Sequence, residues 1–498
     1  MRKLLLATVA VLGASVGVAS IADAQTASPA PGTVTVRLNG RFRFYGLYAS
    51  DQEANNNAVG PVPGGATATG AVGANGQGAL TGTNKLAQYG FVDYIRLYPG
   101  FDGVAANGLK YGASIEIRQD QSSGAGSGQF GSISQTTRAR GGLYVRREWG
   151  YLGTDQLGTV RLGSTDDPSS LYITGTFENF NSGGFNGDLS DAVIASPLQL
   201  TWPFADVSSL YATEKAIYLS PQLYGFDFGV SYEPSTAAVG GDESGCGAGS
   251  AVGVNFVNPA GTFVPANGAN GQGVAGPGCD RLSSTPINQE TGRRKNTLDA
   301  LIRYRGSFGG FGIAATASWI RSSNVKDNQA GIPFNSNRAL PGAGGIRDQF
   351  EGLDVGDFGL AVTYAGFSIG GNAQYGRYNG SWGLSVPGVP SSVAYILGAS
   401  YTIGPVIVGA QYLHYDSPGD LGNAILGRAR QEQGVAYGGT YSLAPGVSIF
   451  FEGSWEQRKQ NGYNFITGQG VSATAPGGNL FSNKVSSNLV ALGTSFSW

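Results

Sequence analysis

Short turns and long loops alternate between the predicted strands of this chain from end to end. The strands are recognised by apolar and polar residues that alternate with a period of two, which places one kind on each face. Antiparallel strands put alternate connections at the same edge of a sheet, so the short turns gather at one edge and the long loops at the other. Strands are expected at residues 33–48, 86–101, 109–119, 214–220, 225–232, 297–305, 312–321, 358–364, 367–378, 391–403, 406–415, 431–443, 447–458 and 484–498, with two more in a hairpin at 146–163.

This difference between the two edges predicts the fold class. About sixteen strands joined in this way predict an all-β protein, a transmembrane antiparallel β-barrel with short periplasmic turns and long extracellular loops. A soluble propeller or sandwich has no reason to separate its connections by length. An even strand count also leaves both termini on the short-turn side, so the first and last strands can pair and no backbone edge meets lipid.

The two faces of the predicted strands differ in polarity. In the hairpin, Arg161 alternates with Val160 and Leu162, and residues 33–48 alternate arginines with aliphatic and aromatic side chains in the same way. In an outer-membrane barrel the polar face lines a water-filled lumen and the apolar face meets lipid. Aromatic residues near strand ends are expected at the two membrane interfaces; these include Trp149, Tyr151, Trp319 and Trp455.

The first residues have the three-part layout of a secretory signal peptide. Arg2 and Lys3 precede an apolar run, and Ala22 and Ala24 flank Asp23 in an Ala-x-Ala cleavage site. The apolar run is about 15 residues long, which is short for a membrane helix of about 20. We therefore expect a signal peptide at 1–24 and one outer-membrane β-barrel at 25–498.

Composition agrees with a barrel and argues against several other classes of protein. The chain has 82 Gly, 24 Tyr and 24 Phe with only 13% charged residues, which is typical of many short aromatic strands joined by Gly-rich loops. The formal net charge of −2 leaves no basic excess, so a nucleic-acid partner is not expected.

Residues that commonly carry chemistry are few. Cys246 and Cys279 lie in a predicted external loop at 233–296, and in an exported protein they are expected to form a disulfide. His414 is the single histidine; a hydrolase would need an activated Ser beside it, so we interpret it as a polar residue at the rim. No catalytic, metal-binding or cofactor-binding residues are predicted, and the chain is not expected to be an enzyme.

Several short motifs resemble those of the bacterial general porins, a Gram-negative outer-membrane family. The most specific is Arg147-Glu148 followed by Gly158-Thr159-Val160-Arg161-Leu162-Gly163; the others are Leu38-Asn39-Gly40-Arg41-Phe42, Ser220-Pro221 before Tyr224-Gly225-Phe226, and the aromatic carboxy-terminal residue Trp498. The resemblance implies a sixteen-stranded barrel that assembles as a homotrimer in outer-membrane lipid. It also implies a water-filled channel for passive diffusion of small hydrophilic solutes and ions.

In that family the loop after the fifth strand folds into the barrel and narrows the pore. The corresponding segment here is 164–212, which contains no Lys or Arg, and its start, Ser164-Thr165-Asp166-Asp167, departs from the Arg-x-Asp that the family often has. The resemblance implies acidic constriction residues Asp166, Asp167, Glu178, Asp188 and Asp191, with Asp206 farther along. The opposing basic residues would be Arg37, Arg41, Arg43, Arg96, Arg118, Arg138, Arg140 and Arg161. Arg146 and Arg147 are adjacent, so one of them is expected to face outward or to lie at the rim.

Two other functions remain open on the sequence. A channel selective for sugars or organic acids would share the same fold, and a surface adhesin or enzyme could use a barrel as its anchor. The preferred ion sign is also open, because the acidic segment favours cations and the arginines favour anions.

Overall fold

The structure of the protein is a computed structural model. The structure describes residues 30–51, 89–120, 143–177, 180, 185, 213–235, 256–257, 263–264, 294–326, 349–379, 382–385, 388–418, 430–460, 463–464, 469–470 and 483–498. The expected signal peptide at 1–24, Cys246 and Cys279 lie outside the described residues, so these expectations stay predictions.

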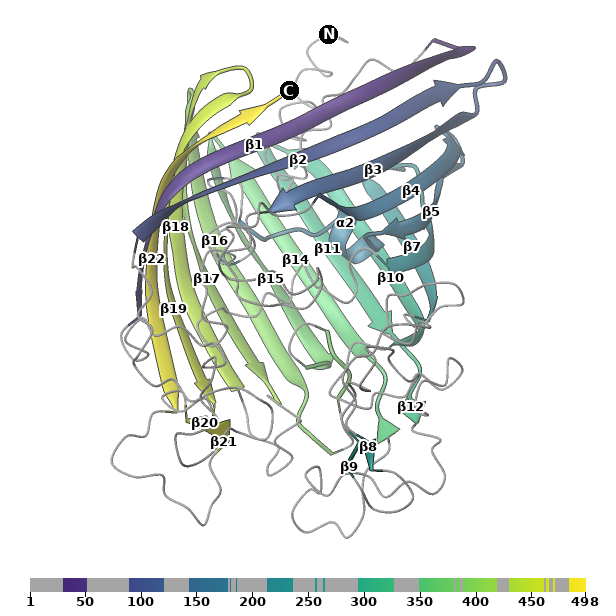
Figure 1. Cartoon of the computed structure of the whole chain (residues 1–498). Helices are drawn as coiled ribbons and strands as arrows, with labels where there is room; N and C mark the ends of the chain where they lie inside the picture. Colours follow the sequence, from purple (N-terminus) through teal and green to yellow (C-terminus); the bar gives the residue numbers. More distant parts are fainter. Residues whose placement is uncertain are drawn as a thin grey trace.

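Sixteen antiparallel strands close into one barrel, which confirms the predicted fold class (Figure 1). The order around the barrel is β1 (Thr33–Asp51), β2 (Tyr89–Val104), β3 (Lys110–Asp120), β4 (Tyr144–Thr154), β5 (Gly158–Thr165), β6 (Thr213–Leu219), β7 (Phe226–Ser235), β10 (Lys295–Phe308), β11 (Phe311–Arg321), β14 (Asp354–Tyr364), β15 (Phe367–Arg377), β16 (Ser392–Ile403), β17 (Val406–Ser417), β18 (Arg430–Ala444), β19 (Val447–Gln460) and β22 (Lys484–Ser497). Within the described ranges, no helix is long and apolar enough to cross a membrane.

The strand boundaries follow the period-two pattern closely, and the differences have local causes. β14 begins at Asp354 rather than at 358, because Asp354 and Gly356 interrupt the apolar pattern yet still pair with β11 and β15. Three two-stranded hairpins occur within segments expected to be loop only: β8 (Phe256–Val257) with β9 (Phe263–Val264), β12 (Val325–Lys326) with β13 (Gln349–Phe350), and β20 (Tyr463–Asn464) with β21 (Gln469–Gly470).

Exposed aromatic side chains mark the apolar band on the outside of the barrel. Phe311 stacks on Tyr364 at the short-turn end, with ring centroids 4.3 Å apart, and Phe367 contacts Tyr401 at the same separation. Tyr375 lies about 26 Å along β15 from Phe367, at about 3.3 Å per residue. A strand tilt near 40° reduces this to about 20 Å of height, close to the apolar band of about 25 Å in known barrels.

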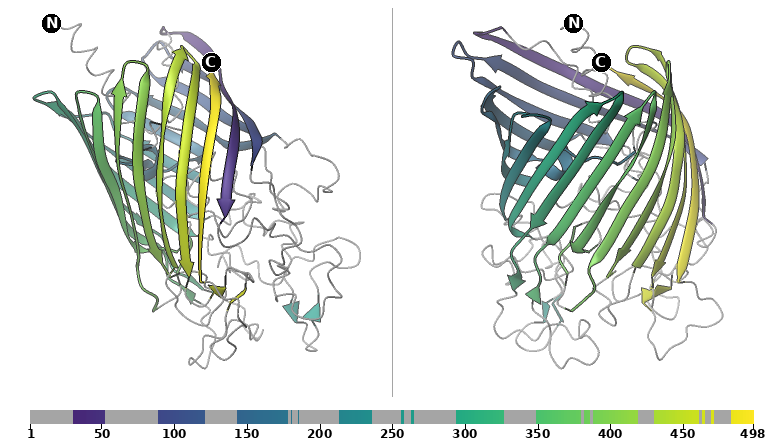
Figure 2. Two further views of the ribbon diagram at one scale, coloured as in Figure 1. Left: turned by 90° about the vertical axis from the view of Figure 1, so that its left-hand side faces the viewer. Right: turned by 180° about the vertical axis from the view of Figure 1, so that it is seen from behind.

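The barrel closes where the two ends of the chain meet. β1 pairs with β22 from Arg41 opposite Ser497 to Asp51 opposite Ser487. Gly40 and Trp498 exchange two backbone hydrogen bonds of 3.1 and 3.2 Å beyond that ladder. Figure 2 shows the described C-terminal strand beside β1 in the view turned by 90°, so no strand of the described barrel is left as an edge.

Candidate pore constriction

Arginine side chains dominate the inner face of β1 to β5. Arg41, Arg96 and Arg118 lie directly opposite one another on β1, β2 and β3. The guanidinium carbons of Arg41 and Arg96 lie 5.5 and 4.5 Å from the ring centroid of Tyr94, which is buried against the same wall. We call the inner face that carries Arg37, Arg41, Arg43, Arg96, Arg118, Arg146, Arg147 and Arg161 the basic wall.

Glu116 is the buried centre of the basic wall. Its carboxylate accepts from Arg118 Nε at 2.5 Å, from Arg146 Nη1 at 2.7 Å and from Arg147 Nε at 2.5 Å. The register between β3 and β4 shifts at Glu116, so Arg146 is the extra residue of a β-bulge. The expectation that one of the two adjacent arginines would face outward or lie at the rim was wrong, because the bulge turns both toward Glu116.

The other arginines of the basic wall also contact carboxylates or aromatic rings. Arg37 Nε lies 2.5 Å from Asp102 Oδ2, and Asp102 also accepts from the Tyr151 hydroxyl. Arg161 lies 5.3 Å from the ring centroid of Trp149. Trp149 and Tyr151 therefore contact wall arginines, and their expected place at the membrane interface was wrong. Arg43 contacts the Phe450 ring at 4.8 Å and Glu452 at 3.8 Å.

The chain turns into the barrel directly after β5. Asp166 forms an ion pair with Arg147 of the basic wall. Asp167 accepts from the Ser170 backbone N–H at 2.8 Å and thereby caps a one-turn helix, α2 (Pro168–Leu171). Burial raises the pKa of Asp167, and nearby Lys215 together with the Ser170 N–H opposes that rise. Figure 1 shows α2 within the ring of strands.

The segment continues along the inner face of the opposite wall. Ser169 donates its N–H and its hydroxyl to the two oxygens of buried Asp299 on β10, at 2.8 and 2.7 Å. Farther on, Asn372 of β15 donates to the Thr174 carbonyl at 3.1 Å. Thr440 of β18 donates to the Phe180 carbonyl at 3.0 Å. We call the described residues 166–177, 180 and 185 the inner segment.

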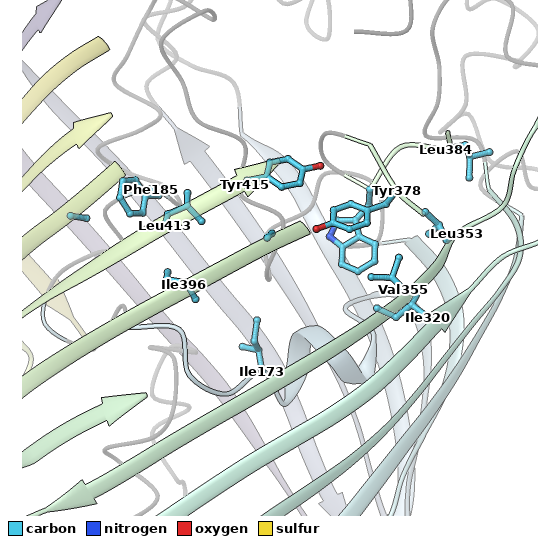
Figure 3. Close-up of a cluster of buried hydrophobic side chains, with 13 residues drawn as sticks. Ile173, Phe185, Ile320, Leu353, Val355, Tyr378, Leu384, Ile396, Leu413 and Tyr415 are labelled. Atoms are coloured by element: carbon cyan, nitrogen blue, oxygen red, sulfur yellow. The ribbon is translucent and has the colours of Figure 1, made fainter. Parts of the chain in front are cut away.

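Three phenylalanines of the inner segment pack on glycines of three successive strands. A Cβ on Gly398 of β16 would lie 2.6 Å from the Phe177 ring, and one on Gly434 of β18 would lie 2.6 Å from the Phe185 ring. Gly409 of β17 meets Phe180 in the same way. Figure 3 shows Ile173 and Phe185 in one buried cluster with Ile396 and Leu413 of the wall. The absence of side chains at the three glycines thus makes room for the inner segment.

The structure therefore brings together only part of the predicted constriction. Arg37, Arg41, Arg43, Arg96, Arg118 and Arg161 all lie on the basic wall, and Asp166 contacts that wall through Arg147. Asp167 is buried as a helix cap. Six predicted residues lie outside the described residues: Glu178, Asp188, Asp191, Asp206, Arg138 and Arg140. Their roles at the constriction stay predictions.

Several site residues were not found from the sequence. The sequence does not predict the contact between Arg147 and Glu116, because alternation of polar and apolar residues does not reveal the β-bulge that brings them together. Asp299 and Asp357, buried on β10 and β14 beneath the inner segment, look in sequence like any other lumen-facing polar residues. The glycines at 398, 409 and 434 share an inward position on neighbouring strands, and that spacing is the signal that could have revealed the path of the inner segment.

His414 occupies the outer part of β17. Its Nε2 lies 3.0 Å from Asp416 Oδ2 and its ring stacks on Tyr395 with centroids 5.0 Å apart. In the described part of the chain, no group of three His, Cys, Asp or Glu side chains could hold a metal ion.

Comparison with known proteins identifies the family. A family model described as Gram-negative porin matches residues 7–461. No curated protein sequence matches the chain. Similar solved structures include an anion-selective porin from Comamonas acidovorans, at 15% identity, TM-score 0.48, and coverage of 94% of this chain and 100% of that one. OmpT of Vibrio cholerae has 12% identity and a TM-score of 0.46, with coverage of 94% of this chain and 100% of that one. A triple mutant of the Rhodopseudomonas blastica porin has 13% identity and a TM-score of 0.43, with coverage of 93% of this chain and 100% of that one.

The match to the family model spans most of the sequence, so the chain belongs to the Gram-negative porin family. It forms an outer-membrane channel for the passive diffusion of small hydrophilic solutes and ions.

Proposed function

We propose that solutes pass between the basic wall and the inner segment, and that this passage prefers anions. The observation that carries the proposal is the unequal exposure of the two charge signs. Arg41 and Arg161 are partly exposed on the basic wall, whereas Asp167, Asp299 and Asp357 beneath the inner segment are each at most 3% exposed. Among these described residues, a solute in the lumen therefore meets the guanidinium groups more directly than the carboxylates.

The same arrangement supports a hydrophilic diffusion pathway. Opposite charges fixed on facing sides of a narrow wet gap produce a transverse field in which water and polar solutes align, while apolar solutes lose hydration. We propose that transport is non-catalytic, with Glu178, Asp188 and Asp191 on the acidic side of that gap, beyond Asp166, which pairs with Arg147, and Asp167, which is buried. Arg138 and Arg140 would extend the basic side.

Planar-bilayer recording in a salt gradient tests the anion preference. The reversal potential should have the sign of anion permeation, and Arg41→Gln should move it toward zero because a partly exposed wall charge is lost. Lys110→Gln removes a charge at the short-turn end of β3 and should change the reversal potential less. Cation-signed reversal in the wild type would overturn the preference, and saturable rather than linear conductance would favour a substrate-selective channel.

We also propose that the channel is a homotrimer, supported by two outward-facing carboxylates. Glu148 and Glu214 are exposed and alternate with Arg147 and Lys215, whose side chains point inward. Ser164 lies between them, opposite both in register. Glu148 lies about 20 Å along β4 from the short turn at about 3.3 Å per residue, a position within the apolar band.

The length of the neighbouring strands supports the same interface. β5 has 8 residues and β6 has 7, fewer than the roughly 9–11 residues of a membrane-spanning strand. Contact with a second copy of the chain would shield the short strands β5 and β6, and the carboxylates of Glu148 and Glu214, from lipid. Three equal closing steps in single-channel records are expected; one closing step per insertion would contradict the trimer.

A further inference from the structure

Three neighbouring side chains on the basic wall have buried polar atoms without a hydrogen-bond partner. Asn39 of β1 lies directly opposite Tyr98 of β2, and Arg41 follows two residues after Asn39 on the same face of the strand. Within the described residues, Asn39 Nδ2, Arg41 Nε and the Tyr98 hydroxyl make no hydrogen bond. Buried polar groups in proteins are nearly always bonded, so three of them side by side point to an acceptor that the chain itself does not supply.

Arg41 also differs from its neighbours in how its charge is compensated. Arg37 and Arg43, on the same face of β1, lie 2.5 and 3.8 Å from carboxylate oxygens. The Arg41 guanidinium instead lies 5.5 Å from the centroid of the Tyr94 ring, and no carboxylate in the described part of the chain pairs with it. A guanidinium held over a ring keeps its N–H donors in its own plane. Arg41 can therefore still bind an anion.

The surroundings of Tyr98 are positively charged. Its side chain interacts electrostatically with Arg41, Arg96 and Arg118, and also with Glu116. Three arginines already pair with the Glu116 carboxylate and compensate its charge. The neighbours of the Tyr98 hydroxyl are therefore mostly hydrogen-bond donors, and an anion among them would accept from the hydroxyl as well.

The spacing of the three side chains suits one small ion. Paired strands lie about 4.8 Å apart, and residues two apart along a strand are separated by about 6–7 Å. The backbone positions of Asn39, Arg41 and Tyr98 thus form a compact triangle from which their side chains can converge. Tyr98 is buried, whereas Asn39 and Arg41 are partly exposed. The hydroxyl therefore forms the floor of the site, and the amide and the guanidinium border the lumen.

A tetrahedral oxyanion matches these donors better than chloride does. Its oxygens carry directional lone pairs that point several ways, so the amide, the hydroxyl and the guanidinium can each meet a separate oxygen. Guanidinium groups also bind phosphate oxygens through parallel N–H groups. Chloride is a single sphere and is held mainly by charge.

We propose that Asn39, Arg41 and Tyr98 bind a tetrahedral oxyanion, such as inorganic phosphate, in the wall of the pore. The site rests on the proposed passage of anions between the basic wall and the inner segment, because its ligand arrives through the lumen. Bound phosphate compensates the charge of Arg41 and occupies space beside the passage. It therefore slows the chloride ions that share this route.

Chloride conductance in planar bilayers tests the site. Inorganic phosphate is added to the wild-type channel at constant ionic strength, and nitrate is added in a parallel experiment. Phosphate should lower the conductance along a saturating curve, whereas nitrate at the same concentration should not. A conductance that changes equally with the two ions would overturn the site.

Two variants without any change of charge assign the effect to these side chains. Tyr98→Phe and Asn39→Leu remove a hydroxyl and an amide, and each should raise the half-blocking phosphate concentration about tenfold, because one hydrogen bond to a charged group is lost. The control is Tyr378→Phe, which removes another buried hydroxyl without a hydrogen-bond partner, directly after β15, and should leave that concentration unchanged. A half-blocking concentration in Tyr98→Phe equal to that of the wild type would overturn the site, and heat-modifiable gel mobility verifies that each barrel is folded.

The reversal potential separates this site from the anion preference. Tyr98→Phe and Asn39→Leu should both keep the wild-type reversal potential in a salt gradient, since neither alters a charge. Anion-signed reversal without a saturable effect of phosphate would overturn the site and leave the preference standing. Cation-signed reversal with an intact phosphate effect would overturn the preference and support the site.

Discussion

At the residue scale, the buried carboxylate of Glu116 allows several arginines to lie close together on the basic wall. Three guanidinium groups converge on one carboxylate that is fully buried, and that carboxylate separates arginines that would otherwise repel one another. Charged pairs in a low-dielectric site are costly to break, because the remaining partner stays buried without compensation. Glu116 therefore contributes both to stability and to the charge that the pore presents.

Glu116→Gln should destabilise the barrel and strengthen the preference for anions. The loss of one buried partner costs about 3–5 kcal/mol in comparable ion pairs, and the wall gains one unit of net positive charge. Guanidinium unfolding in micelles, followed by circular dichroism, measures the first effect, and the reversal potential measures the second. The control is Asp155→Asn, which also removes one negative charge but at an exposed turn, and which should change neither the stability nor the reversal potential. A Glu116→Gln barrel as stable as the wild type would contradict the role of Glu116.

At the scale of elements, the path of the inner segment depends on strand positions that have no side chain. Phe177, Phe180 and Phe185 fit against glycines on β16, β17 and β18, while Ser169 and Thr174 bond to β10 and β15. Packing and hydrogen bonding therefore hold the same segment at several strands of one wall. This attachment leaves the basic wall on the other side of the lumen.

Gly409→Ala should displace the inner segment from the wall. The added Cβ would overlap the Phe180 ring, and an overpacked site of this kind costs about 1–3 kcal/mol. Single-channel conductance should change because the segment borders the pathway, and the unfolding midpoint should fall.

The matched control for that variant is Gly46→Ala on β1. A Cβ on Gly46 would meet Phe91 at 3.5 Å, an ordinary contact, so conductance and stability should stay close to the wild type. If Gly409→Ala behaves like Gly46→Ala, the inner segment is not held by its contact with β17.

At the scale of the whole molecule, the barrel depends on joining strands from the two ends of the chain. The β1–β22 ladder closes the ring, and Trp498 adds two backbone hydrogen bonds while its ring covers Gly40. Closure pairs the backbone groups of β1 and β22 between Arg41 and Asp51, and a membrane requires such pairing of strands that face lipid.

Deletion of Trp498 should weaken closure. Two backbone hydrogen bonds are lost, at about 0.5–1.5 kcal/mol each, together with the aromatic contact to Gly40. The unfolding midpoint should fall in circular dichroism. Trp498→Phe keeps the backbone bonds and an aromatic ring and should lie close to the wild type; equal stability of the deletion and the wild type would show that closure does not depend on this residue.

Much of this architecture could be predicted from the sequence because it follows from local periodicity. Alternation with a period of two determines which side of each strand meets lipid, and the lengths of the connections determine which ends lie together. These two patterns were sufficient for the number of barrel strands, their order and the lumen position of Arg41, Arg43 and Arg161.

The tertiary structure alone decided the contacts that depend on register between distant strands. The β-bulge at Arg146 turns two consecutive arginines toward Glu116. Strict alternation would instead place consecutive residues on opposite faces of the strand. The hydrogen bonds of Ser169 to Asp299, and the fit of three phenylalanines on three glycines, join segments far apart in the chain. The sequence by itself thus determined a barrel with a polar lumen, because strand periodicity is local, whereas the charge that the lumen presents depends on which side chains the closed barrel brings into contact.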